Sequence, residues 1–137
     1  MTPIRTFLVE DSRVIREALV ATLEEMSSLR VVGSADEEAA AIAWLAASEN
    51  QCDLLIVDLF LRRGSGFGVL QAVRSSGRSC IVVVLSNYAT PDVRRRCLML
   101  GADRVFDKSG EIDALIDFCA QLAERQSGTT EPAARSA

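Results

Sequence analysis

Five polar residues stand at the end of a short apolar run or directly after one. Glu10 and Asp11 follow FLV, Asp58 ends LLIVD, Ser86 follows VVVL, and Lys108 follows VFD. In a parallel sheet all strands point the same way, so residues after the strands gather at the carboxyl edge, where such folds bind ligands. We therefore expect three carboxylates, one hydroxyl and the chain's only lysine to meet in one crevice.

This set of groups is suited to phosphoryl transfer onto an aspartate. Clustered carboxylates repel one another, and a hard divalent cation relieves that repulsion. Mg²⁺ fits because it takes oxygen ligands and keeps several waters. The carboxylate of Asp58 can then attack phosphorus and form an acyl phosphate. The ammonium of Lys108 and the hydroxyl of Ser86 can hold the new phosphoryl oxygens.

Each residue taken alone also has a purely structural interpretation. Asp11 or Ser12 can cap a helix, Ser86 can be a turn residue, and Lys108 can be a solvated charge. Asp58 is harder to explain in this way, because an acid that ends an apolar strand is partly buried and needs a partner. The combination of residues therefore carries more weight than any member.

Five apolar runs alternate with five segments of helical periodicity. The expected strands are Ile4–Val9, Val31–Val32, Leu54–Val57, Ile81–Leu85 and Arg104–Phe106. The first expected helix has an apolar stripe of Val14, Ile15, Ala18, Leu19, Thr22 and Leu23, and the others are Glu37–Ala47, Gly66–Arg74, Pro91–Leu100 and Glu111–Arg125. The runs LLIV and IVVVL lack alternation, as in strands covered by helices on both faces. The predicted fold class is α/β, a single doubly wound five-stranded parallel sheet flanked by five helices.

Local signals mark several helix ends. Thr90 followed by Pro91 is typical of an N-cap with proline at the first helical position. Gly77 and Gly101 stand where helices should stop, and Ser109 can cap the last helix.

Composition restricts the possible functions. A length of 137 residues indicates one domain, and a net charge of −4 argues against nucleic-acid or anionic-membrane binding through charge. The absence of histidine excludes a Ser-His-Asp triad, a Cys-His pair and a histidine-ligated zinc site within this sequence. Four cysteines lie far apart without a C-x-x-C motif, which indicates reduced, mostly buried thiols: Cys52, Cys80, Cys97 and Cys119.

The two ends of the sequence differ from its centre. The N-terminus lacks the apolar core of a signal peptide, and no apolar run approaches the ~18 residues of a membrane span, so we expect a cytoplasmic protein. Hydrophobic residues nearly vanish after Arg125. We therefore expect a domain over residues 1–125 and a disordered C-terminal tail over 126–137.

The site residues, in this order on these strands, resemble the receiver domain of bacterial two-component response regulators, the group that includes the single-domain chemotaxis regulator. The motifs are Glu10-Asp11 in FLVED, Asp58 in LLIVDL, Ser86 in VVVLSN and Lys108 in FDKS, and the resemblance covers about residues 4–125. It implies a flavodoxin-like sheet with strand order 2-1-3-4-5.

The resemblance also implies a role for each site residue. Asp58 would be the phosphoacceptor, while Ser86 and Lys108 would hold the phosphoryl group. Mg²⁺ would be bound by Asp58, by Asp11 directly, by Glu10 through water and by the main-chain carbonyl of Phe60. The donor would be a histidine kinase or a histidine phosphotransfer protein. Such a protein is not an enzyme beyond catalysing its own phosphorylation and dephosphorylation.

The sequence departs from the family pattern at several positions. Ser109 stands where proline usually follows the lysine, and Val105 stands in place of the usual aromatic switch residue. Phe106 is one position later and so belongs on the opposite face of its strand. Asn87 replaces a small residue, and Arg62 replaces a proline. None of these changes removes a reactive group.

Because no DNA-binding, cyclase or kinase segment follows Arg125, we expect a stand-alone receiver that signals by protein contact or relays the phosphoryl group. Helix four has three consecutive arginines, Arg94, Arg95 and Arg96, and at least two of them should be exposed. This helix and the strand and helix that follow it form a candidate surface for an acidic protein target, with no role for nucleic acid or membrane.

Other interpretations are weaker. An FMN domain shares the architecture, but Glu10 and Asp11 would repel its phosphate. The alternative that stays open is a degenerate receiver-like interaction module that is not phosphorylated.

The glycines in GSGFG, from Gly64, do not match G-x-G-x-x-G and indicate a flexible loop before a helix. Phe60 and Tyr88 lie two residues beyond Asp58 and Ser86. Two interpretations of their rings stay open: they flank the mouth of the site, or they only pack on neighbouring loops.

Overall fold

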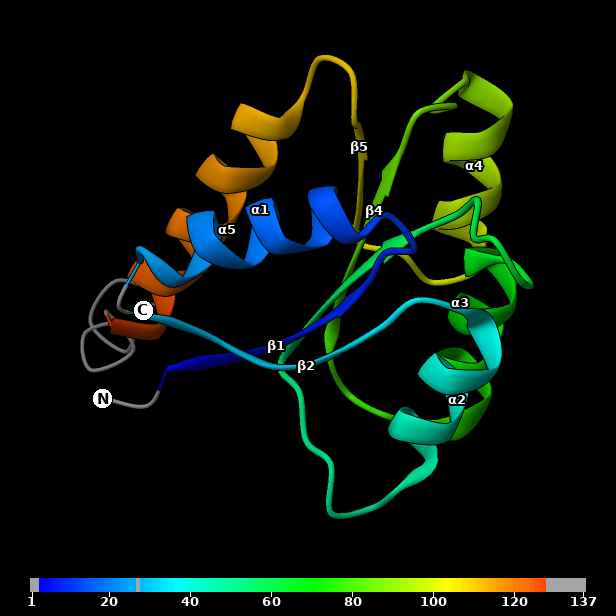
Figure 1. The fold of residues 1–137 in the computed structure, drawn as a ribbon, viewed down its shortest axis with the longest axis horizontal. Coiled ribbons are helices and arrows are strands. Elements are labelled where there is room, and N and C mark those ends of the chain that lie inside the picture. The colour runs from blue at the N-terminus through cyan, green and yellow to red at the C-terminus, as the bar shows by residue number, and fades with distance from the viewer. Residues whose placement is uncertain (1–2, 27, 128–137) are drawn as a thin grey trace, which may run out of the picture.

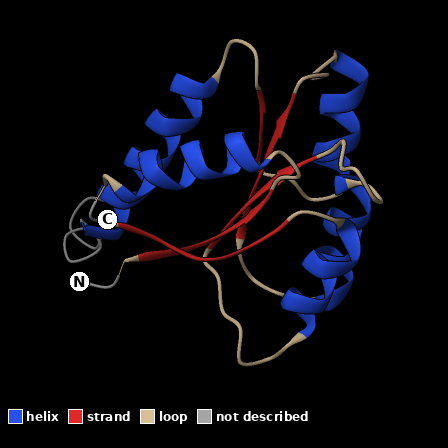
Figure 2. Ribbon diagram, in the orientation of Figure 1, coloured by secondary structure: helices blue, strands red, loops and turns tan. Residues whose placement is uncertain are grey.

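The computed structural model describes residues 3–26 and 28–127. Within them the strands are β1 (Ile4–Val9), β2 (Leu29–Ala35), β3 (Leu54–Asp58), β4 (Ile81–Ser86) and β5 (Arg104–Asp107). The helices are α1 (Arg13–Glu24), α2 (Glu38–Ala46), α3 (Gly66–Ser76), α4 (Pro91–Met99) and α5 (Ile112–Ser127). The alternation of strand and helix predicted from the sequence is confirmed (Figures 1 and 2).

The five strands form one parallel sheet with the order β2-β1-β3-β4-β5, as predicted. Helices α1 and α5 cover one face of the sheet, and α2, α3 and α4 cover the other (Figure 1). The order reverses direction between β1 and β3, and the crossover helices therefore fall on both faces. Ligands of such sheets bind at this reversal, outside the carboxyl ends of the strands.

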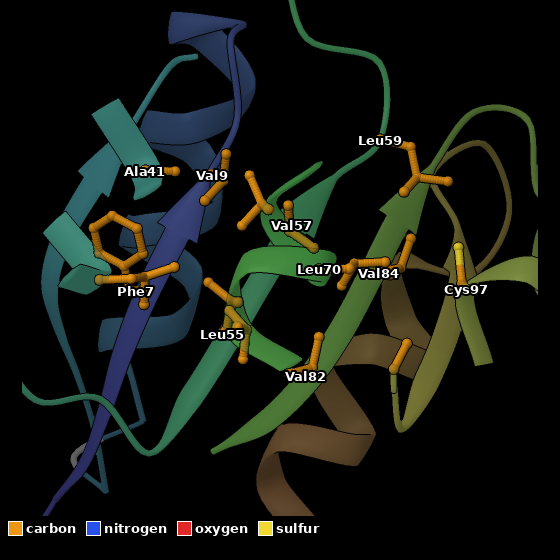
Figure 3. Close-up of a cluster of buried hydrophobic side chains, with 14 of the residues drawn as sticks. Phe7, Val9, Ala41, Leu55, Val57, Leu59, Leu70, Val82, Val84 and Cys97 are labelled. Atoms are coloured by element: carbon orange, nitrogen blue, oxygen red, sulfur yellow. The ribbon is translucent and has the colours of Figure 1, made fainter. Parts of the chain in front are cut away.

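The central strands are apolar on both faces because both faces carry helices. In β3 and β4, Leu55, Val57, Val82 and Val84 point toward α2–α4 (Figure 3), whereas the residues between them point toward α1 and α5. All side chains of β3 are buried, including that of Asp58. The sheet and its helices therefore form two apolar cores, one on each face, which hold the strand ends in place.

The strand register brings the ends of the strands level. Val9 pairs with Val57, Asp58 with Leu85, and Ser86 with Asp107. Residues that follow β1, end β3 and β4, and follow β5 consequently lie along one edge of the sheet.

Several predicted helix ends are confirmed. Thr90 accepts a hydrogen bond from the amide of Val93 at 3.2 Å, and Gly77 and Gly101 have φ values of 70° and 100°. The prediction that Ser109 caps the last helix is wrong. Its hydroxyl donates to Asp107 at 2.6 Å, and α5 begins three residues later at Ile112.

The apolar stripe predicted for α1 is wrong in part. Leu19 and Leu23 are buried, but Val14 is 79% exposed, and Ala18 and Thr22 are also exposed. Successive residues are turned by about 100° around a helix, so only one of two adjacent i, i+4 rows can face the sheet.

The last helix runs slightly past the predicted domain boundary. Helix α5 continues to Ser127, two residues beyond the expected end of the domain at Arg125. The predicted disordered tail otherwise falls on residues 128–137, which lie outside the described residues. No helix in the described part of the chain is long and apolar enough to cross a membrane.

The glycine segment leads into α3, which begins at Gly66 as predicted. The hydroxyl of Ser65 caps the helix by accepting from the amides of Phe67 and Gly68. Gly66 packs directly on the end of β3, where a Cβ atom would lie 2.3 Å from the carbonyl oxygen of Asp58. Only glycine allows α3 to begin so close to the strand that carries the acid.

We predict that Gly66→Ala lowers the free energy of unfolding by about 2 kcal/mol, because the added Cβ must displace backbone atoms. Gly110→Ala is the control, since a Cβ there meets no atom within 4 Å. Its effect should stay within about 1 kcal/mol. Urea unfolding of both variants tests this, and equal stabilities would contradict the close-approach argument.

Candidate functional site

Three carboxylates converge at the carboxyl edge of the sheet. Glu10 and Asp11 follow β1, Asp58 ends β3, and a carboxylate oxygen from each lies within 4.8 Å of the others. No other group of three or more His, Cys, Asp or Glu side chains in the described part of the chain is arranged to hold a metal ion. The sequence predicted this cluster, and the geometry brings its three members together.

Lys108 supplies the nearest positive charge. Its Nζ lies 2.7 Å from Oε1 of Glu10 and 2.9 Å from Oδ2 of Asp58, and its side chain is 8% exposed. Burial lowers the pKa of Lys108, but the two carboxylates outweigh burial and hold it above its usual value. One ammonium cannot balance three carboxylates, so the pocket has a negative excess and favours a cation.

Glu10 is nearly inaccessible, with an exposed fraction of 1%. Its Oε2 accepts from the amide of Ser12 at 3.0 Å. Its Oε1 contacts the Lys108 ammonium as an ion pair but lacks hydrogen-bond geometry. Burial raises the pKa of Glu10, and the interaction with Lys108 opposes that rise. A buried oxygen without a hydrogen bond is an available acceptor for a metal-bound water or another donor.

Asp58 is 5% exposed, as expected for an acid at the end of a buried strand. Its Oδ1 accepts from the amide of Phe60 at 3.3 Å, and its Oδ2 accepts from Lys108 at 2.9 Å. Both oxygens are therefore oriented before any ligand binds.

Ser86 and Lys108 are joined through the backbone. The amide of Lys108 donates to the carbonyl of Ser86 at 2.9 Å, and the Ser86 hydroxyl accepts from the amide of Tyr88 at 3.1 Å. Ser86 is fully buried and adjoins Leu85, the partner of Asp58 across the sheet. The sequence-predicted hydroxyl thus belongs to the same edge as the carboxylates.

Asp107 shapes the loop that holds Lys108. Its carboxylate accepts from the amide and the hydroxyl of Ser109 at 2.8 and 2.6 Å. These hydrogen bonds lower the pKa of Asp107. The residue that stands in place of proline therefore closes the turn by hydrogen bonding.

A second set of contacts, which the sequence did not suggest, links the loops after β4 and β5. The guanidinium of Arg94 donates to the carbonyls of Ala89 and Val105 at 2.9 and 3.0 Å and to Oε1 of Glu111 at 2.8 Å. The same carboxylate oxygen accepts from the amide of Asp107 at 2.8 Å. The hydrogen bond from Arg94 holds the pKa of Glu111 below its usual value. Arg94 is therefore a structural tie.

The other two arginines of α4 are exposed, which confirms the prediction of at least two. Arg95 pairs with Asp92 at 3.0 Å, and Arg96 lies over the ring of Phe67 at 4.0 Å. Of the three consecutive arginines of α4, Arg95 and Arg96 are therefore the two that a partner protein could contact, because Arg94 is hydrogen-bonded to the neighbouring loops.

Two aromatic rings pack against each other on the loops after β3 and β4. Phe60 and Tyr88 are 48% and 61% exposed, and their ring centroids are 5.0 Å apart in an edge-to-face arrangement. Because the amide of Phe60 contacts Asp58 and that of Tyr88 contacts Ser86, the pair spans the loops after β3 and β4.

The predicted opposite orientation of Val105 and Phe106 is confirmed. Val105 is buried on the side of α2–α4, and Phe106 is buried on the other side, with its ring 6.0 Å from that of Phe118. Neither side chain is placed to swing between a surface and a buried position as an exposed aromatic would.

Two further positioning contacts also escaped sequence reasoning. Arg16 donates to the carbonyl of Glu10 at 2.8 Å, and Glu38 accepts from the amide of Ser65 at 2.8 Å. Glu38 is 27 residues from its partner and Arg94 is 17 from Glu111. No local sequence pattern predicts the Glu38–Ser65 or the Arg94–Glu111 contact, because each joins two separate elements.

Comparison with known proteins identifies related sequences. A family model described as the response regulator receiver domain matches residues 6–120. The uncharacterized transcriptional regulatory protein YvfU of Bacillus subtilis is 32% identical over 115 residues, which are 83% of this chain and 56% of that protein. A cyclic di-GMP phosphodiesterase of Thermotoga maritima is 30% identical over 108 residues, 79% of this chain and 28% of that protein. The chain spans about half or less of these relatives.

Solved structures show the same architecture. The receiver domain of the putative response regulator NarL of Mycobacterium tuberculosis superposes with a TM-score of 0.75 at 26% identity, covering 88% of this chain and 98% of that one. The response regulator domain of Thermotoga maritima CheB gives a TM-score of 0.76 at 18% identity, covering 90% and 95%. The second likeness supports the fold alone.

We predict that Lys108→Met lowers the free energy of unfolding by about 3 kcal/mol at neutral pH with a chelator present, since it leaves two buried carboxylates without a cation. The loss should shrink as the pH falls, because burial raises the pKa of Glu10 and a protonated carboxyl needs no cation. Arg95→Met removes an exposed cation and should cost less than about 1 kcal/mol. Urea unfolding measures both. A Lys108→Met loss no larger than that of Arg95→Met would contradict the buried-cluster argument.

Proposed function

Because this chain belongs to the response regulator receiver domain family, we propose that it accepts a phosphoryl group on Asp58 from a histidine kinase or a histidine phosphotransfer protein in a Mg²⁺-dependent reaction. The observation that carries this proposal is the convergence of Asp58 with two further carboxylates and with Lys108 in one buried pocket. A buried acid with a purely structural role needs one cationic partner. Asp58 has one, Lys108, but it also lies beside two further carboxylates, which a structural role does not explain.

The residues present fit a magnesium ion. The donors are hard oxygens, the pocket is negative, and Oε1 of Glu10 is buried without a hydrogen bond. We assign the ligands as Asp11 and Asp58, Glu10 through water, and the main-chain carbonyl of Phe60. When bound, the ion offsets the repulsion between the carboxylates and the incoming phosphoryl oxygens.

Asp58 acts as the nucleophile. One carboxylate oxygen forms a bond to phosphorus while the bond from phosphorus to the donor's nitrogen or oxygen breaks, and its electron pair leaves with the donor. The product is an acyl phosphate. Hydrogen bonds from the Phe60 amide and from Lys108 hold the carboxylate in position before the reaction, which reduces the entropy lost on reaching the transition state.

Lys108 and Ser86 hold the product. The ammonium, which donates to Oδ2 of Asp58 in the unphosphorylated state, turns to the more negative phosphoryl oxygens. The Ser86 hydroxyl accepts from an amide and has its own proton left to donate. Both residues leave their places only slightly, because their backbones are hydrogen-bonded to each other.

The signal passes to other proteins through the loops that hold these two residues. Arg94 and Glu111 join the loop after β4 to the loop after β5. A displacement of either loop would therefore also displace α4 and the start of α5. Arg95, Arg96 and the adjoining β5 and α5 form the output surface, whose exposed cations suit an acidic protein target.

The second candidate function is a receiver-like interaction module that is never phosphorylated. The exposed arginines of α4 would serve such a module equally well. Retention of a buried, destabilising cluster of carboxylates favours the phosphorylated function.

We predict that one phosphoryl group per chain is taken up from a small acyl-phosphate donor when Mg²⁺ is present and none when it is chelated. Intact-mass measurement detects the gain. Asp58→Asn should abolish it because an amide is not a nucleophile toward phosphorus, while Asp92→Asn, an exposed acid of α4, should leave it unchanged. An unchanged gain in Asp58→Asn would refute the assignment, and no gain in the unaltered protein would support the interaction module.

We further predict that the double variant Phe60→Asn/Tyr88→Glu loses its phosphoryl group roughly tenfold faster than the unaltered protein. Hydrolysis needs a water in line with the breaking bond. The paired rings of Phe60 and Tyr88, on the loops after β3 and β4, would hinder its approach and cannot orient it. The decay of isolated phosphoprotein is followed over time. Leu98→Asn/Met99→Glu, which changes exposed apolar residues of α4, is the control. Equal or slower decay in the Phe60 and Tyr88 variant would show that the rings do not shield the site.

A further inference from the structure

A pair of cysteines lies at the amino edge of the sheet, opposite the carboxylate pocket. Cys80 directly precedes β4, and Cys52 stands two residues before β3. The two strands are parallel neighbours, with Leu54 paired to Ile81, and the Ile81 amide donates to the carbonyl of Asp53 at 2.9 Å. Two residues 28 apart in sequence are thereby placed side by side.

Both thiols point to the same face of the sheet. Cys52 belongs to the core cluster beneath α2–α4, and Cys80 packs against that cluster. Because the Ile81–Asp53 hydrogen bond joins the residues beside them, the two thiols are neighbours on that face, and each is the largest influence on the pKa of the other. Cys97 and Cys119, by contrast, lie in the cores on opposite faces of the sheet and cannot meet.

A surface hollow opens beside Cys52. The hollow has a volume of about 530 Å³, and its lining includes Arg5, Cys52, Asp53 and Arg78. Cys80 does not line the hollow but is only half-buried. A small molecule in the hollow therefore lies next to Cys52, although that side chain is only 5% exposed.

The surroundings favour a thiolate at Cys52. The neighbouring thiol of Cys80 and the positive charge of Arg78 lower the pKa of Cys52, against the effect of burial. The neighbouring Cys52, together with burial, raises the pKa of Cys80. One sulfur is thus the better nucleophile and the other keeps its proton.

We propose that Cys52 and Cys80 form an oxidation site at which hydrogen peroxide produces a reversible intramolecular disulfide. The Cys52 thiolate attacks peroxide, so that a sulfur–oxygen bond forms, the oxygen–oxygen bond breaks and hydroxide leaves. The Cys80 sulfur, losing its proton, then attacks the sulfenic sulfur of Cys52 and displaces its oxygen as water. Peroxide is reduced to two waters, and the two thiols together lose two electrons.

The disulfide would close a loop from Cys52 to Cys80 that contains β3 with Asp58 and the whole of α3. It would fasten the strand of the carboxylate pocket to its neighbour at the far end of the sheet. The site is separate from the carboxylate pocket, and its chemistry does not depend on phosphorylation.

The test treats dilute, reduced protein with stoichiometric hydrogen peroxide, alkylates the remaining thiols after denaturation, and maps the peptides by mass spectrometry. We expect a peptide in which Cys52 is linked to Cys80, with Cys97 and Cys119 still alkylated, and full reversal by dithiothreitol. The Cys97→Ser/Cys119→Ser variant should form the same link. Cys80→Ser should stop at a sulfenic or sulfinic acid on Cys52.

Thermal unfolding gives a second measurement that needs no variant. The oxidised protein should unfold at a higher temperature than the reduced protein, because the link constrains the unfolded chain. Oxidation in urea should yield mixed pairings instead. The absence of the Cys52–Cys80 peptide, a link between two chains, or a lower unfolding temperature after oxidation would each overturn the proposal. None of these readouts depends on Asp58 accepting phosphate.

Discussion

The structure is organised around a buried electrostatic imbalance, in which three carboxylates meet one ammonium at the carboxyl edge of a parallel sheet. Such a cluster is unfavourable in isolation because burial removes the water that would screen its charges. It persists because two apolar cores fix the strands from both faces, and because the strand register sets Val9 beside Val57 and Asp58 beside Leu85. The stability of the cores therefore sustains a pocket that is poised to bind a cation.

The loops around the pocket are held by contacts that span long stretches of sequence. Glu38 binds the start of α3, Arg16 binds the carbonyl of Glu10, and Arg94 joins the loops after β4 and β5. Each of these contacts ends on a backbone group rather than on a reactive side chain. Loop geometry is thus fixed while Asp58 and Lys108 keep their functional atoms directed into the pocket.

Membership of the response regulator receiver family makes the replacement of the usual aromatic residue by Val105 informative. Val105 is buried, and Phe106 is packed into the opposite core against Phe118, so neither can report on the pocket by changing exposure. The Arg94–Glu111 pair occupies the space between the two loops that carry Ser86 and Lys108, and it is partly exposed to solvent. A hydrogen-bonded pair of this kind would couple the positions of the two loops through its hydrogen bonds and charges, whereas a buried ring would couple them through side-chain packing.

The sequence by itself determined the elements, the strand order implied by its family resemblance, and which polar residues meet at the carboxyl edge. Strand and helix periods are local, and the residues after parallel strands must meet at one edge. Tertiary structure decided which row of α1 faces the sheet, why Gly66 is needed, and that Ser109 bonds to Asp107 instead of capping α5. It also decided the pairings of Arg94 with Glu111 and of Cys52 with Cys80. These contacts join elements that are distant in sequence, and their partners are set only when helices pack and strands take their register, which no local pattern encodes.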